Sequence, residues 1–102
     1  MSNALALLRA VMARLDRPEA WCQGAFAVDD QGCAVAIESG YVVATDLAGA
    51  AMLHARYGGP ERLAEALRFK DALAMRNWND APDRTHADII ARLDEAIERE
   101  GK

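Results

Sequence analysis

Apolar residues recur at intervals of three and four along four stretches of this 102-residue chain, and this spacing constrains the fold more than any other feature. Such spacing places the apolar side chains on one face of an α-helix. The four stretches predict helices over residues 3–16, 44–57, 60–76 and 85–99. A chain of this length has room for one hydrophobic core, so we expect a single domain over residues 1–102.

Residues that stop or start helices support these boundaries. Pro18 disfavours helical backbone in the residue before it, so the first helix should end at about residue 16. The glycine pair at 58–59, followed by Pro60, separates the second helix from the third. Thr85, with an acidic residue three positions later, predicts a capping box at the start of the last helix.

Residues 20–37 follow a different pattern. The Asp-Asp-Gln-Gly sequence at 29–32 is typical of a turn, and it lies between two stretches that predict strands, residues 20–28 and 33–37. We expect a β-hairpin in which Val28 pairs with Cys33, or with a register shifted by one residue through a glycine bulge. The predicted fold is therefore α+β, with about four helices packed against one hairpin.

Charge and composition exclude several classes of protein. The chain has 16 acidic and 12 basic residues, a net charge of −4, so we expect no binding to nucleic acid. We expect no signal peptide, because Arg9 and Arg14 interrupt the apolar pattern of the N-terminal stretch, and no membrane span, because no apolar run is long enough; both favour a cytoplasmic protein. Cys22 and Cys33 are not spaced as a metal or redox motif, and we expect no disulfide, no metal site and no cofactor.

Two motifs far apart in the chain are distinctive. The first reads Trp21-x-x-Gly24-x-x-Ala27-x-Asp29-x-x-Gly32, and the second reads Trp78-Asn79-Asp80-x-x-x-Arg84-Thr85-x-x-Asp88. Together they resemble a small family of uncharacterised bacterial and phage domains, marked by a Trp-Gly-Ala hairpin opening and a Trp-Asn-Asp…Arg-Thr segment. The resemblance covers most of the chain and implies an architecture without an activity. A cysteine common in that family near the start of the middle helix has no counterpart in residues 45–50.

The segment before the last helix has two interpretations. In the first it belongs to a structural clamp, made of Trp21, Trp78, Arg84 and Thr85. Trp78 would then fill the gap between the last two helices, and Asn79 and Asp80 would bond nearby backbone amides. Arg84 would form an ion pair with Asp80 or Asp46.

In the second interpretation the same segment is a binding site. Its residues would be Trp78, Asn79, Asp80, Arg84 and His86, which could hold a small anionic group at a helix N-terminus. Catalysis would need a base with an orienting partner, and Asp80 with His86 is the best pair in the chain. No glycine-rich phosphate loop, metal-ligand spacing or nucleophile motif accompanies that pair, so we do not expect an enzyme.

Two classes of function follow. The first is a small interaction or inhibitor module of bacterial or phage origin, which binds another protein, or a second copy of itself, through its helices or its hairpin edge. The alternative is a small-molecule-binding domain or enzyme that uses the segment 78–86. A pocket that brings Asp46, Asp80 and Arg84 together would favour the alternative, whereas a broad exposed apolar patch would favour the first class.

Overall fold

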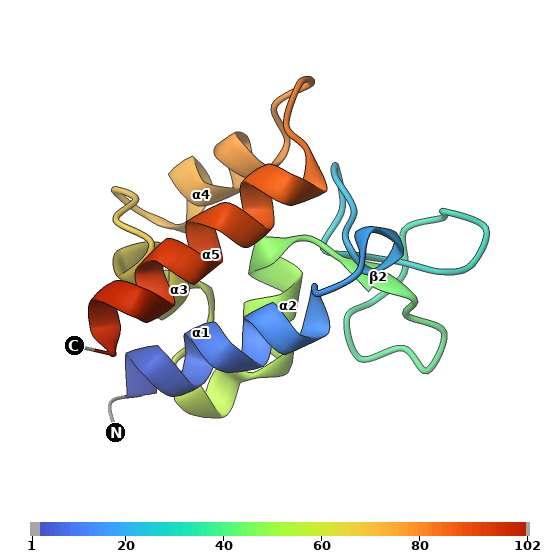
Figure 1. Cartoon of the computed structure of the whole chain (residues 1–102). Helices are drawn as coiled ribbons and strands as arrows, with labels where there is room; N and C mark the ends of the chain where they lie inside the picture. Colours follow the sequence, from blue (N-terminus) through green and yellow to red (C-terminus); the bar gives the residue numbers. More distant parts are fainter. Residues whose placement is uncertain (1–2, 102) are drawn as a thin grey trace.

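A computed structural model describes residues 3–101, which form five α-helices and a small antiparallel pair of strands. The helices are α1 (Asn3–Arg14), α2 (Leu47–Leu53), α3 (Gly59–Ala66), α4 (Ala72–Asn79) and α5 (His86–Glu100), shown in Figure 1. The strands are β1 (Ala27–Val28) and β2 (Ala44–Thr45), and single 3₁₀ turns cover Pro18–Ala20 and Ala55–Tyr57. The α+β class is therefore confirmed, with five helices among the described residues rather than about four.

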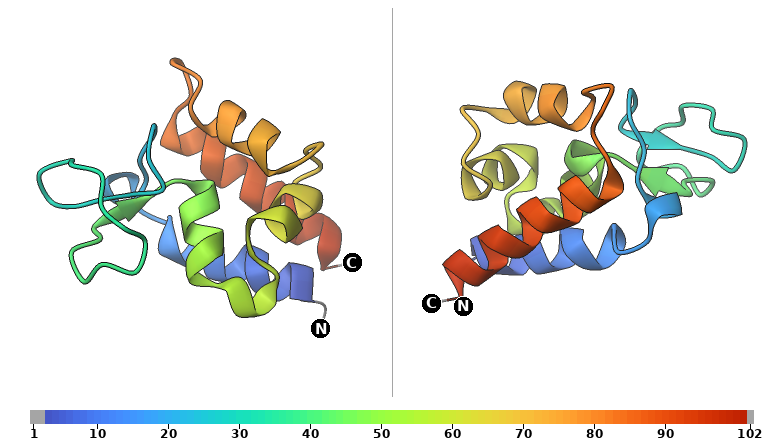
Figure 2. Two further views of the ribbon diagram at one scale, coloured as in Figure 1. Left: turned by 180° about the vertical axis from the view of Figure 1, so that it is seen from behind. Right: turned by 45° about the horizontal axis from the view of Figure 1, so that its top comes forward.

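The helices enclose one cluster of buried apolar side chains. α1 packs against α5 and α3, and α2 packs against α3 and α4. Figures 1 and 2 show α1 and α5 side by side, so that the two ends of the described chain lie near each other. The large side chains of the core are Leu7, Leu8, Val11, Leu15, Leu47, Leu63, Leu67, Met75, Ile89 and Leu93. Burial of these side chains supplies most of the driving force for folding.

The predicted helix over 60–76 is two helices, because the chain turns sharply after α3. Arg68 has a left-handed backbone with φ of 65°. Its amide donates to the Glu65 carbonyl at 3.0 Å, and the next amide, of Phe69, donates to the Ala64 carbonyl at 2.8 Å. This is the Schellman pattern of a helix C-terminus. Asp71 then starts α4 by accepting a hydrogen bond from the amide of Ala74 at 2.8 Å.

The predicted helix over 44–57 is also shorter than expected. Residues 44 and 45 belong to β2, and Asp46 is the N-cap of α2. The Oδ1 atom of Asp46 accepts a hydrogen bond from the Gly49 amide at 2.6 Å. The α-helix ends at Leu53 and continues as a 3₁₀ turn. A Cβ atom on Gly49 would collide with the carbonyl oxygen of Phe26, so the absence of a side chain there lets the strand region lie directly against α2.

The first and last helices match their predictions closely. α1 ends at Arg14, two residues before the expected boundary, and α5 runs one residue beyond its own. Thr85 and Asp88 form the expected capping box: each side chain accepts a hydrogen bond from the backbone amide of the other residue. The box fixes the start of α5 directly after the segment 78–84.

The predicted hairpin is wrong in its partner strand. β1 pairs with β2, with Ala27 opposite Thr45 and Val28 opposite Ala44. The arm 33–37 adds a single bridge, Val28 to Ala34, which is one residue from the predicted Val28–Cys33 pair. Gly32 at the end of the turn has a φ of 77°, and this extra turn residue shifts the register. β2 leads directly into α2, so a strand paired with β2 also lies against that helix, as the contact of the Phe26 backbone with Gly49 shows.

Residues 29–43 form a lobe that extends away from the helices in both views of Figure 2. The Asp29 side chain holds the turn at its tip by accepting hydrogen bonds from the amides of Gln31 and Cys33, each at 2.9 Å. Both cysteines are free thiols in this structure. Within residues 3–101 no helix is long and apolar enough to cross a membrane.

Candidate functional site

Asn79, the last residue of α4, is completely buried and makes four hydrogen bonds through its side chain. Its Oδ1 accepts from Trp21 Nε1 at 2.9 Å and from the Leu47 amide at 3.2 Å. Its Nδ2 donates to the Cys22 carbonyl at 3.2 Å and to Asp80 Oδ1 at 2.9 Å. The two donors and two lone pairs of the amide are therefore all used, and the side chain ties α4 to the start of α2 and to residues 21–22.

Two neighbouring side chains extend this connection. Asp80 Oδ1 accepts a hydrogen bond from the Gly24 amide at 3.0 Å. Gln23 Nε2 donates to the carbonyl oxygens of Asn79 and Ala81 at 2.9 and 2.8 Å. The segment 21–24 is thus bound to the C-terminal end of α4 along its whole length. The role of Gln23 could not be predicted from the sequence, because nothing in its local sequence indicates which carbonyl groups it meets.

Trp78 and Arg84 contact each other where α4 and α5 meet, and Trp78 is a partly buried residue packed against the core. The Arg84 Nε donates to the Trp78 carbonyl at 2.8 Å, and its guanidinium carbon lies 4.1 Å from the centroid of the Trp78 ring. The guanidinium carbon of Arg92 lies 5.1 Å from the centroid of the same ring. The Phe69 ring also packs against the Trp78 ring, with 5.6 Å between the two centroids. The predicted ion pair of Arg84 with Asp80 or Asp46 is wrong, because its carboxylate neighbour is Asp88 at 3.9 Å.

His86 does not meet Asp80, so the one acid–base pair that the sequence offered is not assembled. Its Nε2 lies 2.6 Å from the carbonyl oxygen of Leu15. A carbonyl can only accept, so this nitrogen carries a proton and donates it. The imidazole ring also packs near Trp21, 6.4 Å between centroids. His86 therefore joins the start of α5 to the end of α1.

Beneath this segment lie two titratable groups with raised pKa values, the fully buried Asp46 and the half-buried Cys22. Asp46 is fully buried, and burial raises the pKa of its carboxyl to about 6, with the nearby Asp80 raising it and Arg76 lowering it. Burial, with help from Asp46 and Asp80, raises the pKa of the Cys22 thiol to about 12. Such a thiol stays protonated and unreactive at neutral pH. Asp46 and Asp80 are thus neighbours, but Arg84 points elsewhere.

A groove of about 490 Å³ lies between the arm 34–38 and α2, on the opposite side of the strand region. Its large apolar lining side chains are Phe26, Val35, Ile37 and Met52, and one acidic residue, Glu38, lines it at the end of the arm. One cation, Arg76, also lines it and stacks on Phe26 with 4.2 Å from the guanidinium carbon to the ring centroid. The Arg76 Nε is buried and has no hydrogen-bond partner within residues 3–101. The position of Arg76 in this groove could not be predicted, because nothing in the sequence distinguishes it from other arginines on helices.

No group of three or more His, Cys, Asp or Glu side chains within residues 3–101 is arranged to hold a metal ion. Of the described polar side chains, those predicted as a binding site form internal contacts: Asn79, Asp80, Arg84 and His86 bond to backbone groups of other segments. The structure brings Trp21, Asn79 and Asp80 together, places the His86 ring near Trp21, and leaves Arg84 on separate contacts with Trp78 and Asp88.

One family model, described as a family of unknown function (DUF6197), matches residues 1–99. Neither the search of curated proteins nor the search of solved structures finds a match.

Proposed function

Because the chain belongs to DUF6197, a family of unknown function, we propose its function from its surface: it is a protein-interaction module. Its partner is an extended protein segment that carries apolar side chains and a carboxylate. The segment lies in the groove between the arm 34–38 and α2, and its carboxylate pairs with Arg76. The observation that carries this proposal is an apolar groove with one buried guanidinium nitrogen that has no partner among the described residues.

The chemistry of the groove supports an acidic apolar partner. The side chains of Phe26, Val35, Ile37 and Met52 offer apolar area that a partner would remove from water. A buried N–H without an acceptor is unfavourable, and a carboxylate supplies the acceptor that a guanidinium binds best. The stacking of Arg76 on Phe26 holds the guanidinium in place before the partner arrives, which lowers the entropy lost on binding.

The backbone of the arm supports an extended conformation for the partner. Asp29 N donates to the Cys33 carbonyl, and Val35 N donates to the Ala27 carbonyl. In an antiparallel pair this pattern turns the N–H and C=O groups of the residue between, Ala34, away from β1. An extended segment that lies beside the arm can bond to these groups, as in recognition by strand addition.

The origin and compartment expected from the sequence are part of the proposal. Two free thiols, one of them exposed, suit a reducing cytoplasm. The resemblance of the two tryptophan motifs favours a bacterial or phage protein, for which inhibition of a host or competitor protein is one form of interaction. The net charge of −4 supports a protein partner over nucleic acid.

The segment 78–86 is not chosen as the docking site, because its polar groups already bond within the domain. Asn79 has no exposed surface, and Arg84 and His86 each bond to a backbone carbonyl. A ligand at this segment would have to displace those contacts. We therefore propose no small-molecule or catalytic function for it.

Selection from a library of random linear peptides tests the proposal. The enriched peptides should alternate apolar and polar residues and contain Asp or Glu. When an enriched peptide is added, the amide signals that move in NMR spectra should be those of residues 24–27 and 34–38. Failure to enrich any peptide, or signal changes confined to residues 78–86, would contradict the proposal.

Two pairs of variants separate the groove from general surface effects. Val35→Asp places a charge in the groove, whereas Val43→Asp places it on an exposed apolar residue of the same lobe outside the groove. Arg76→Met removes the guanidinium but keeps an apolar chain against Phe26, and Arg9→Met removes an exposed arginine of α1. Binding should be lost only in the groove variant of each pair.

A further inference from the structure

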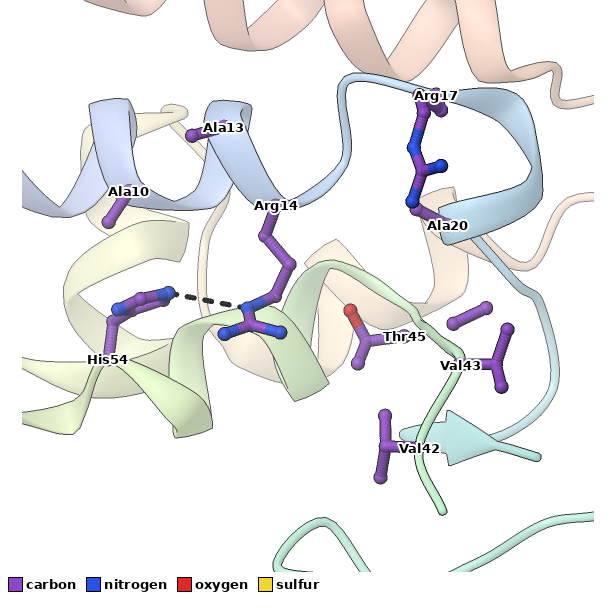
Figure 3. Close-up of a pocket in the computed structure, with 10 residues that line it drawn as sticks. Ala10, Ala13, Arg14, Arg17, Ala20, Val42, Val43, Thr45 and His54 are labelled. Carbon is purple, nitrogen blue, oxygen red and sulfur yellow. Dashed lines mark hydrogen bonds between the residues drawn. The ribbon is translucent and has the colours of Figure 1, made fainter. Parts of the chain in front are cut away.

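A second pocket, of about 370 Å³, lies between α1, the 3₁₀ turn Pro18–Ala20 and the segment that leads into β2 (Figure 3). Its polar lining residues are Arg14, Arg17, Thr45 and His54, and the rest are alanine and valine. Asp and Glu are absent from its lining, although acidic residues outnumber basic ones in the chain, 16 to 12. The pocket is therefore locally positive in an acidic protein.

Arg14 is held in the pocket by His54. The Nε of Arg14 donates to His54 Nε2 at 3.3 Å, and Figure 3 shows the guanidinium between the His54 ring and Thr45. Since Nε2 accepts this bond, the imidazole is neutral. Burial and the adjacent Arg14 and Arg56 lower the pKa of His54, which keeps the ring neutral at pH 7. The terminal nitrogens of Arg14 make no hydrogen bond or ion pair within residues 3–101.

Thr45 supplies an independent sign of a ligand. It is only 2% exposed, and its Oγ1 has no hydrogen-bond partner within residues 3–101. In Figure 3 the oxygen points from β2 into the space between Arg14 and Arg17. A buried hydroxyl that bonds to nothing is unfavourable, and native structures seldom keep one without a partner. A ligand oxygen in this pocket would accept its proton.

Arg17 closes the pocket on the side of the 3₁₀ turn. Its guanidinium nitrogens lie 4.0 Å from a carboxylate oxygen of Asp16 and 3.8 Å from one of Glu19, and all three side chains are exposed. Exposed pairs at such distances are weak, so a ligand can compete for the guanidinium. The remaining wall, which includes Ala13, Ala20 and Val42, is smooth and apolar and fits a short aliphatic group.

From these contacts we propose that this pocket binds a small organic anion, with its carboxylate or phosphate oxygens on Arg14, Arg17 and the Thr45 hydroxyl and its aliphatic part against the alanine and valine wall. Two guanidinium groups recognise carboxylate and phosphate by the same paired hydrogen bonds. The site shares no residue with the groove at the arm 34–38, so it stands independently of the proposed interaction function.

An NMR titration of the whole chain tests the proposal, with sodium phosphate and sodium isobutyrate as probes and sodium chloride at equal ionic strength as the reference. We expect saturable changes in the Thr45 amide and the His54 ring signals, together with a rise in the pKa of His54 as the anion offsets Arg14. Saturation by either probe supports the pocket and identifies the preferred head group. Changes that match those in sodium chloride would overturn it.

Three variants make the test specific. Arg14→Gln should lower the affinity for the probe that saturates the pocket by about tenfold or more, since it removes a charge-assisted contact. Arg9→Gln removes the same charge from an exposed position of the same helix and should leave affinity unchanged. Thr45→Val keeps the shape but removes the hydroxyl, so it should weaken binding several-fold while Tm stays equal or rises. Equal affinity in Arg14→Gln and Arg9→Gln, or wild-type affinity in Thr45→Val, would refute the proposed site.

Discussion

Single buried polar residues hold the strand region onto the helices. Asn79 is the clearest case, because its amide satisfies the Trp21 indole, the Leu47 amide and the Cys22 carbonyl at once. The partners come from positions 32 to 58 residues away in the sequence. The net gain from each of these hydrogen bonds is small. The larger effect is that, without Asn79, several buried donors and acceptors would have no partner, which is costly.

Asn79→Ala should therefore lower the free energy of unfolding by about 3 kcal/mol, because it leaves several buried donors and acceptors unpaired. Asn77→Ala, on an exposed position of the same helix, is the control and should change it by less than about 0.5 kcal/mol. Urea denaturation of both variants measures the difference. Equal stability of the two would show that the network has little energetic weight.

Asp46 makes the stability of the fold depend on pH. Its pKa is about 6 in the folded protein against an ordinary value of 3.8, so the folded state binds the proton more tightly than the unfolded state. The resulting stabilisation is complete below about pH 4 and is lost as the pH rises through about 6. The shift corresponds to up to about 3 kcal/mol.

Asp46→Asn keeps an oxygen for the Gly49 amide and removes the titration. The difference in free energy of unfolding between wild type and this variant should therefore change between about pH 4 and about pH 6, in favour of the wild type at the lower pH. Asp71→Asn, the same change at the less buried N-cap of α4, is the control. Denaturation curves over this range that show no pH-dependent difference for Asp46→Asn would contradict the assignment.

At the scale of elements, the turn between α3 and α4 is the clearest departure from the sequence prediction. Arg68 occupies the left-handed position of a helix C-terminus, where glycine is favoured and a residue with a Cβ is strained. The chain pays this cost because α4 must turn back to place Met75 in the core and Asn79 against residues 21–22.

Arg68→Gly should consequently stabilise the protein by about 0.5–1 kcal/mol, with a rise in Tm, since glycine adopts this conformation without strain. The control is Lys70→Gly, two residues later in the same connection. Lys70 does not have a positive φ, so this change should lower Tm or leave it unchanged. Thermal unfolding followed by circular dichroism measures both. A lower Tm for Arg68→Gly than for Lys70→Gly would contradict the role of the turn.

Helix spacing predicted the existence of α1 and α5 well, because long amphipathic stripes and the Thr85 cap are local signals. It joined α3 to α4 because Leu63, Leu67 and Leu73 continue one stripe, and only the backbone at Arg68 interrupts it. The strands were harder. Pairing of β1 with β2 depends on contacts between residues 27–28 and 44–45, and the short alanine-rich sequence of each strand does not select a partner.

Of the candidate site, too, only the part with local sequence signals could be predicted. The Trp78–Thr85 segment has local turn and cap signals, and the structure places it where helices α4 and α5 meet. Its partners in residues 21–24 lie 56 to 58 residues away along the chain and follow from tertiary packing alone. The groove around Arg76 and the pocket around Thr45 likewise join side chains from separate elements.

At the scale of the whole molecule, the helical body and the lobe 29–43 differ in how they treat apolar groups. The helices bury most of theirs in one core, although Leu73 of α4 is 63% exposed, whereas Tyr41 and Val43 on the lobe are 79% and 53% exposed. The lobe has one bridge to β1 and few other backbone hydrogen bonds, so it is the part of the described chain with most freedom to adapt to a partner. A helical body that buries most of its large apolar side chains and a lobe that leaves apolar surface exposed are consistent with the proposed interaction module.

The most direct test of this account compares two arginines. Calorimetric titration of a library-selected peptide should give at least about tenfold weaker binding to Arg76→Met than to wild type, because the peptide carboxylate loses its partner. Arg84→Met, which removes the cation beside Trp78, should bind with wild-type affinity at a temperature where circular dichroism shows all three proteins folded. Loss of binding in Arg84→Met with wild-type affinity in Arg76→Met would place the binding site at the segment 78–86 and contradict the account.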